Sequence, residues 1–183
     1  SLLNHYIGAR AHSAPVILDE HAALRIFILG SFRDFEELSP TSLEILRALV
    51  RGLRELGWEA WLSGDAPSQE IAGGDLGAWE MTERLEASCD LAVFVVTAHG
   101  REAGWASELA TLRATHPERS GRRLVVIPEG YELSKVLDPA EGGLLGHPPV
   151  LISRYSGEED LLNQISTYAA FMAKWGHLPS PLE

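Results

Sequence analysis

Residues 25–31 read RIFILGS, a short apolar run that ends in a glycine and a serine. A continuous apolar run of this length is typical of a strand that is buried on both faces, as strands inside parallel sheets are. A second run, LAVFVVT at residues 91–97, is rich in β-branched and aromatic residues and indicates a central strand. Shorter runs at residues 58–63, 123–128 and 150–154 bring the number of predicted strands to five.

Helical patterns separate these strands. Apolar residues recur at spacings of three and four between residues 43 and 56, which predicts an amphipathic helix. Thr41 and Glu44 form a capping-box pattern before it, and Gly57 is a typical left-handed stop after it. Three further helices are predicted at residues 78–88, 105–116 and 158–172.

Strands that alternate with helices predict right-handed crossovers, and hence a parallel sheet with helices on both faces. With five strands, the expected architecture is α/β, doubly wound and flavodoxin-like, with the strand order 2-1-3-4-5. A chain of 183 residues has the usual size of one domain, and we expect residues 25–183 to form it. Residues 1–24 stand outside the alternation, and we expect them to form an N-terminal arm or an edge strand.

Composition restricts the partners of the protein. Twenty-six acidic residues against fifteen basic ones give a formal net charge of −11, which repels polyanions, so duplex nucleic acid is not an expected partner. The apolar runs are far shorter than the ~20 residues of a membrane helix, so no membrane partner is expected either. The seven histidines form no H-E-x-x-H or comparable pair, and we expect no metal site.

The N-terminal sequence and the cysteine content of the chain indicate its cellular compartment. Residues 1–10 lack the basic start and apolar stretch of a secretory signal, and the single Cys89 suits a reducing compartment, so a cytoplasmic location is expected. Because the chain begins with Ser1 rather than Met, we expect it to be part of a longer protein.

Ligands of open parallel sheets collect beyond the carboxyl ends of the strands, where the connections diverge to opposite faces. For the order 2-1-3-4-5 this place lies between the first and third strands, at the loops 30–34 and 97–104. The first loop offers a glycine for close backbone approach, a hydroxyl group and an aromatic ring, although an ordinary turn with one flexible glycine explains it equally well. The residues of this loop that we assign to the substrate are Gly30, Ser31, Phe32 and Arg33.

The helix after the second loop carries a candidate catalytic carboxylate. At about 100° per residue, Trp105, Leu109 and Leu112 share one face, and Glu108 falls at the edge of that face. A carboxylate at the rim of a buried stripe is costly to desolvate unless something pairs with it or uses it. Two hypotheses therefore stand for Glu108, a functional carboxylate or a residue that borders the solvated face. Glu102 is a second candidate ligand, or a charge that the helix dipole favours.

Three segments resemble the nucleoside 2-deoxyribosyltransferase-like family: RIFILGSF at 25–32, CDLAVFVV at 89–96 and EAGWASELA at 102–110. The resemblance spans residues 25–112 and agrees with a flavodoxin-like sheet. It implies an enzyme that cleaves the N-glycosidic bond of a nucleoside or nucleotide, and that Glu108 attacks or stabilises the anomeric carbon. It implies no cofactor.

The same resemblance implies roles for other residues. Glu102 would hold the sugar hydroxyls, and Gly104 belongs to the same motif, where backbone N–H groups could bind phosphate. We add Trp105 and Trp79 to the substrate-binding residues, Trp79 because its helix should border the crevice, although tryptophans in such positions are more often core or rim residues. Members of this family often complete one subunit's pocket with another subunit, so a homo-oligomer is also expected.

Two other hypotheses remain open. Trp105 and Glu108 also resemble the helix of TIR-type NAD-cleaving domains, in which a tryptophan shortly precedes the catalytic glutamate, and NAD would then be a substrate. Both families break an N-glycosidic bond with one glutamate. The third hypothesis is a non-catalytic nucleotide-binding or interaction module, because a fold does not determine a function.

Overall fold

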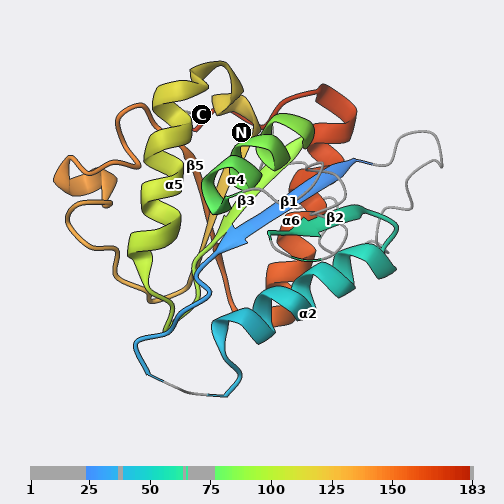
Figure 1. Cartoon of the computed structure of the whole chain (residues 1–183), viewed down its shortest axis with the longest axis horizontal. Helices are drawn as coiled ribbons and strands as arrows, with labels where there is room; N and C mark the ends of the chain where they lie inside the picture. The colour runs from blue at the N-terminus through green and yellow to red at the C-terminus, as the bar shows by residue number, and fades with distance from the viewer. Residues whose placement is uncertain (1–23, 37–38, 64, 66–76, 182–183) are drawn as a thin grey trace.

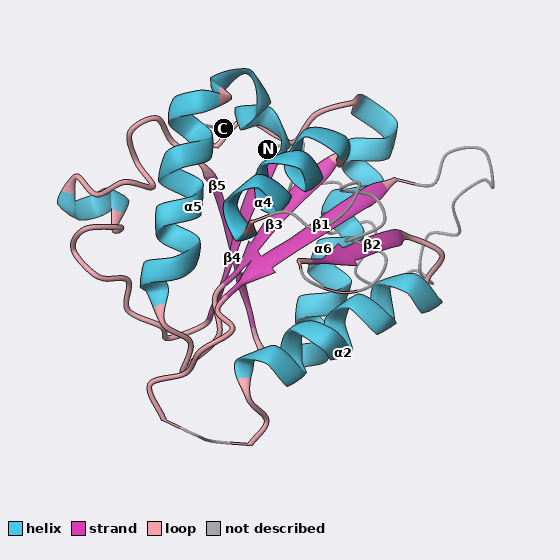
Figure 2. Ribbon diagram, in the orientation of Figure 1, coloured by secondary structure: helices cyan, strands magenta, loops and turns pink. Residues whose placement is uncertain are grey.

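One parallel sheet of five strands forms the centre of the protein, shown here by a computed structural model that describes residues 24–36, 39–63, 65 and 77–181. The strands lie in the order β2-β1-β3-β4-β5, and all four neighbouring pairs are parallel (Figure 2). The predicted α/β flavodoxin-like fold and its strand order are therefore confirmed. The arm predicted for residues 1–24 lies, apart from Leu24, outside the described residues. The strands are β1 (Arg25–Gly30), β2 (Glu59–Leu62), β3 (Leu91–Val95), β4 (Arg123–Pro128) and β5 (Leu151–Tyr155).

Helices cover both faces of the sheet. Figure 1 shows α2 and α6 on one face and α4 and α5 on the other, and each face has its own apolar core. No helix in the described part of the chain has the length and apolar character that a membrane span requires. The α-helices are α2 (Ser42–Glu55), α4 (Ala78–Ser88), α5 (Glu102–Thr115) and α6 (Gly157–Trp175). Two short 3-10 helices that the sequence did not predict are η1 (Pro117–Arg122) and η2 (Pro139–Glu141).

The central strands are buried on both sides, as their unbroken apolar sequences predict. Along β1, Ile26 and Ile28 pack toward α2 and α6, whereas Phe27 and Leu29 pack toward α4 and α5. This alternation follows from the two-residue repeat of a strand. β1 and β3 are hydrogen-bonded neighbours, so the loops that follow them leave the sheet side by side.

The start and end of α2 agree with the sequence signals. The Thr41 side chain accepts a hydrogen bond from the Glu44 N–H at 3.2 Å, and the Glu44 carboxylate accepts one from the Thr41 N–H at 2.7 Å. This capping box satisfies two N–H groups that would otherwise lack partners. After the helix, Gly57 has a φ of 95°, a left-handed conformation that favours glycine.

A buried ion pair joins three elements on the α4 and α5 side of the sheet. Arg123 of β4 and Glu86 of α4 are each 1 % exposed, and Arg123 Nη2 donates to Glu86 Oε1 at 2.5 Å. The same nitrogen donates to the carbonyl of Leu112 in α5 at 3.3 Å and to that of His116 at 3.0 Å. Cys89 is buried beside this pair, with its thiol 3.2 Å from the Glu86 carbonyl, and burial raises the pKa of the thiol to about 12.

Candidate functional site

The loops after β1 and β3 are hydrogen-bonded to each other. An antiparallel bridge joins Asp34 to Gly100, the Phe35 N–H donates to the His99 carbonyl at 2.9 Å, and the Arg101 N–H donates to the Arg33 carbonyl at 3.0 Å. The two loops therefore form a short ladder that continues from the ends of the two central strands.

Side chains fasten these loops to the start of α2. The Asp34 carboxylate accepts hydrogen bonds from the Ser42 N–H at 3.0 Å and from the Ser42 hydroxyl, and Ser42 Oγ lies 2.5 Å from Thr97 Oγ1. Ser42 and Thr97 are each 2 % exposed, so their contact is buried, whereas Asp34 is half-buried. On the other side, the Ser31 hydroxyl donates to the Arg101 carbonyl. The backbone ladder and these contacts fix both loops at the place where the sequence predicts a ligand site.

A cavity of about 400 Å³ lies between the β1 loop and the first two turns of α5. Its volume is within the range of pockets that bind small molecules. Six of the nine site residues predicted from the sequence, Glu108 among them, line this cavity. The residues that line the cavity are Gly30, Ser31, Phe32, Arg33, Arg101, Ala103, Gly104 and Glu108.

Glu108 is the only carboxylate among the described residues that line this cavity. It is half-buried, and it makes no hydrogen bond or ion pair with any other described residue. Loss of water around the side chain raises the pKa of Glu108 above its ordinary value of 4.5. The structure thus places a partly desolvated carboxylate without a protein partner at the wall of a cavity.

Positive groups lie on the same cavity. Arg33 and Arg101 are exposed, and neither forms an ion pair with another residue in the described ranges. The Arg101 guanidinium lies 5.4 Å from the centre of the Phe35 ring, and its Nε donates to the Asp34 carbonyl at 3.3 Å, so its position is fixed. The cavity therefore presents two cationic side chains as well as the carboxylate of Glu108.

The first turn of α5 also leaves polar groups available. Arg101 is the N-cap residue and gives no side-chain hydrogen bond to the helix, so the first N–H groups of α5 have no cap from this side chain. An ideal Cβ placed on Gly104 would meet no atom within 4 Å. The helix terminus is consequently open on the side that lines the cavity.

The other three predicted site residues do not line the cavity. Trp105 is 1 % exposed and packs against Phe94 of β3, with ring centroids 6.4 Å apart. Trp79 lies near the start of α4 and is 37 % exposed. The Glu102 carboxylate accepts a hydrogen bond from the Tyr131 hydroxyl at 2.5 Å, and burial, together with this contact, raises the pKa of Tyr131. Glu102 therefore already has a protein partner.

Sequence reasoning missed two cavity residues and the network that supports the loops. Arg101 and Ala103 lie within the predicted loop 97–104 but carried no motif of their own. Asp34 precedes Ser42 by eight residues and Thr97 by 63, a separation for which helix and strand periodicity provides no signal. No group of three or more metal-ligating side chains is present in the described ranges.

Comparison of the chain with protein-family models, with curated proteins and with solved structures gave no match in any of the three cases.

Proposed function

We propose that the protein cleaves the N-glycosidic bond of a nucleoside or nucleotide, as a hydrolase or as a deoxyribosyltransferase, with Glu108 as the catalytic residue. The observation that carries this proposal is the Glu108 carboxylate, which is half-buried, has no hydrogen-bond or ion-pair partner among the described residues and lines a cavity of about 400 Å³ at the crossover point of the sheet. A carboxylate that pays a desolvation cost without pairing is a candidate for a functional group.

The reaction needs one carboxylate and one water or acceptor. A Glu108 oxygen adds to C1′ of the sugar while the C1′–N bond breaks, and the electron pair leaves with the base, which takes a proton from solvent. A water molecule then adds to C1′, the ester bond to Glu108 breaks, and a proton is released. If a second base adds in place of water, the sugar is transferred. Charge stabilisation of the sugar cation by the same carboxylate would lower the same barrier.

The remaining cavity residues would bind and orient the substrate. Phe32 is 47 % exposed and offers a ring face to a base. Arg33, Arg101 and the open N-terminus of α5 favour a substrate with a negative group, because guanidinium groups and helix N–H groups both bind phosphate. Ser31 contributes to the wall, but its hydroxyl is already donated to the Arg101 carbonyl, so its role is to hold the loop.

The test is base release by the full chain. We would incubate the protein separately with mixed deoxynucleosides, with their 5′-monophosphates and with NAD, and measure free base or nicotinamide by chromatography. We expect turnover with one of these classes, and a loss of about 10³-fold in rate for Glu108→Gln. Glu132→Gln is the matched control, because Glu132 is exposed and lies outside the cavity, and its rate should equal that of the unmodified protein.

Three results would decide between the hypotheses. Release of base at the normal rate by Glu108→Gln would refute the catalytic assignment. Cleavage of NAD alone would favour the TIR-like hypothesis over a nucleoside substrate. Binding without turnover of any of the three classes would show a non-catalytic nucleotide-binding module.

A further inference from the structure

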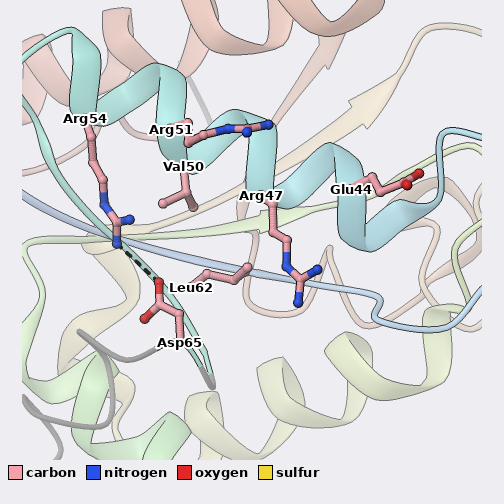
Figure 3. A pocket seen from close by; sticks show the side chains of 7 residues that line it. All are labelled: Glu44, Arg47, Val50, Arg51, Arg54, Leu62 and Asp65. Atoms are coloured by element: carbon pink, nitrogen blue, oxygen red, sulfur yellow. Dashed lines mark hydrogen bonds and ion pairs between the residues drawn. The ribbon is translucent and has the colours of Figure 1, made fainter.

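A second cavity, of about 360 Å³, lies between α2 and the end of β2 and shares no lining residue with the Glu108 cavity. α2 packs on the face of the sheet opposite to α5, so the two cavities belong to different layers of the molecule. Figure 3 shows the side chains that line the second cavity, which are Glu44, Arg47, Val50, Arg51, Arg54, Leu62 and Asp65.

Positive charge is concentrated in this cavity. Three of the fifteen basic residues of a strongly acidic chain, Arg47, Arg51 and Arg54, lie within eight positions on α2. Like charges three and four residues apart are neighbours on a helix and disfavour it. Arg47 and Arg51 make no ion pair or side-chain hydrogen bond with any other described residue. Their charge is therefore not neutralised by the part of the chain that the structure describes.

The two acidic side chains of the cavity already have partners. The Glu44 carboxylate accepts the Thr41 N–H at 2.7 Å as part of the capping box. Asp65 accepts a hydrogen bond from Arg54 Nη2 at 3.2 Å, and Arg54 Nε donates to the Ala60 carbonyl of β2 at 3.0 Å. Arg54 is thus fixed against β2, and Arg47 and Arg51 remain to bind a ligand.

The floor of the cavity is apolar. Val50 of α2 is 3 % exposed and Leu62 of β2 is 4 % exposed. In Figure 3, Arg47 and Arg54 extend from the same side of α2 with Val50 and Leu62 between them, and Arg51 runs along the helix toward its Glu44 end. Arg47 and Arg54 are seven residues apart, which is about 10 Å along a helix. A ligand that fits here combines an oxyanion with an apolar body.

We propose that this cavity binds a small phosphomonoester with an apolar or aromatic body. The phosphate lies at Arg47 and Arg51, which are four residues apart and therefore neighbours on α2. Their side chains extend in different directions in Figure 3, and both are exposed and long enough to turn to a shared phosphate, whose oxygens planar guanidinium groups bind through paired hydrogen bonds. The body lies over Val50 and Leu62, which are themselves 3 % and 4 % exposed, so its apolar contacts are mainly with the aliphatic stems of the arginine side chains around them. This site does not depend on the proposed reaction at Glu108, and a protein without glycosidase activity could still possess it.

The experiment measures binding of phenyl phosphate to the full chain by titration calorimetry at low ionic strength. We expect the double variant Arg47→Gln/Arg51→Gln to bind at least tenfold more weakly than the unmodified protein. The control is Lys135→Gln/Lys174→Gln, which removes the same charge from exposed positions elsewhere, and its affinity should stay within twofold. Thermal melts of all variants show that they are folded. The charge-preserving variant Arg47→Lys/Arg51→Lys should also bind several-fold more weakly, because lysine lacks the planar fork.

Further probes test the chemistry of the ligand. Inorganic phosphate and phenol should each bind more weakly than phenyl phosphate, because each supplies only half of the contacts. The proposal is overturned if the unmodified protein does not bind phenyl phosphate, or if the arginine and lysine double variants lose affinity equally. Tighter binding of benzoate would overturn the assignment to a phosphate, and tighter binding of a short acidic peptide would overturn the assignment to a small molecule.

Discussion

At the scale of single residues, Glu108 differs from the other acidic side chains around the cavity. The Glu102 carboxylate accepts a hydrogen bond from the Tyr131 hydroxyl, and Asp34 accepts hydrogen bonds from Ser42. Glu108 has no such contact and yet is half-buried. Its raised pKa has a single physical cause, the loss of water around the charged form. The free energy needed to ionise Glu108 is therefore higher in the folded than in the unfolded protein.

This cost predicts an effect on stability with a definite sign. Since the pKa of Glu108 is higher in the folded than in the unfolded protein, its favourable contribution is complete below about pH 4.5 and is lost as the pH rises through the folded value. At pH 7, Glu108→Gln should therefore raise the melting temperature, by a shift on the order of 2 °C. Calorimetric melts between pH 4 and pH 8 would measure it. A variant that melts below the unmodified protein at pH 7 would contradict the prediction.

At the scale of elements, Gly100 in the loop after β3 and Gly104 in α5 have opposite surroundings. A Cβ on Gly100 would lie 2.9 Å from Ser31 Cβ and would also strike the Thr97 hydroxyl, whereas a Cβ on Gly104 in α5 would meet nothing. We therefore expect Gly100→Ala to destabilise the protein by about 1–3 kcal/mol through overpacking. Gly104→Ala should stabilise it by up to about 1 kcal/mol, because alanine favours a helix more than glycine does.

Urea unfolding measures the free energy of unfolding of both variants and so tests the two predictions together. Each variant adds the same methyl group within five residues of the other, so each serves as the control of the other. Equal stabilities for the two variants would show that the contact between the loops is looser than the structure indicates.

The elements also show how far the sequence could be interpreted. The strands and α2 followed from apolar runs, leucine spacing and the Thr41 cap, because these signals are local. The predicted strand order then indicated that Gly30 and Glu108 lie at the same ligand site, and both line one cavity. Trp105 was assigned to the ligand, yet the periodicity that put it on one face with Leu109 and Leu112 already indicated the buried face. The partner of Glu102 comes from an irregular segment 29 residues away, for which periodicity provides no signal.

At the scale of the whole molecule, the pair of Glu86 and Arg123 connects one helical layer to the sheet. It joins α4 to β4 and, through the Leu112 carbonyl, to α5. Buried pairs of this kind contribute little when compared with apolar residues, but the loss of one member leaves a poorly compensated buried charge. Without Arg123, Glu86 keeps only Arg119 Nε at 3.5 Å. The layer that carries Glu108 is therefore sensitive to the loss of either partner.

The corresponding prediction compares single and double substitutions. Arg123→Met should lower the free energy of unfolding by about 3 kcal/mol, because it leaves the buried Glu86 carboxylate with only the longer contact to Arg119 Nε, at 3.5 Å. Glu86→Leu combined with Arg123→Met should cost less than that single change. Denaturant unfolding of the three proteins measures the difference. A double variant that is less stable than Arg123→Met would show that the pair itself stabilises the protein.

The ladder between the β1 and β3 loops has a consequence for the order of events in a sugar transfer. Because the backbones of residues 33–35 and 99–101 are joined, we expect the donor and acceptor bases of the proposed reaction to use the one cavity beside Glu108, each in turn. The first base has to depart before the second arrives, with the sugar held on the enzyme in the interval. A transfer catalysed here would then follow ping-pong kinetics rather than pass through a ternary complex.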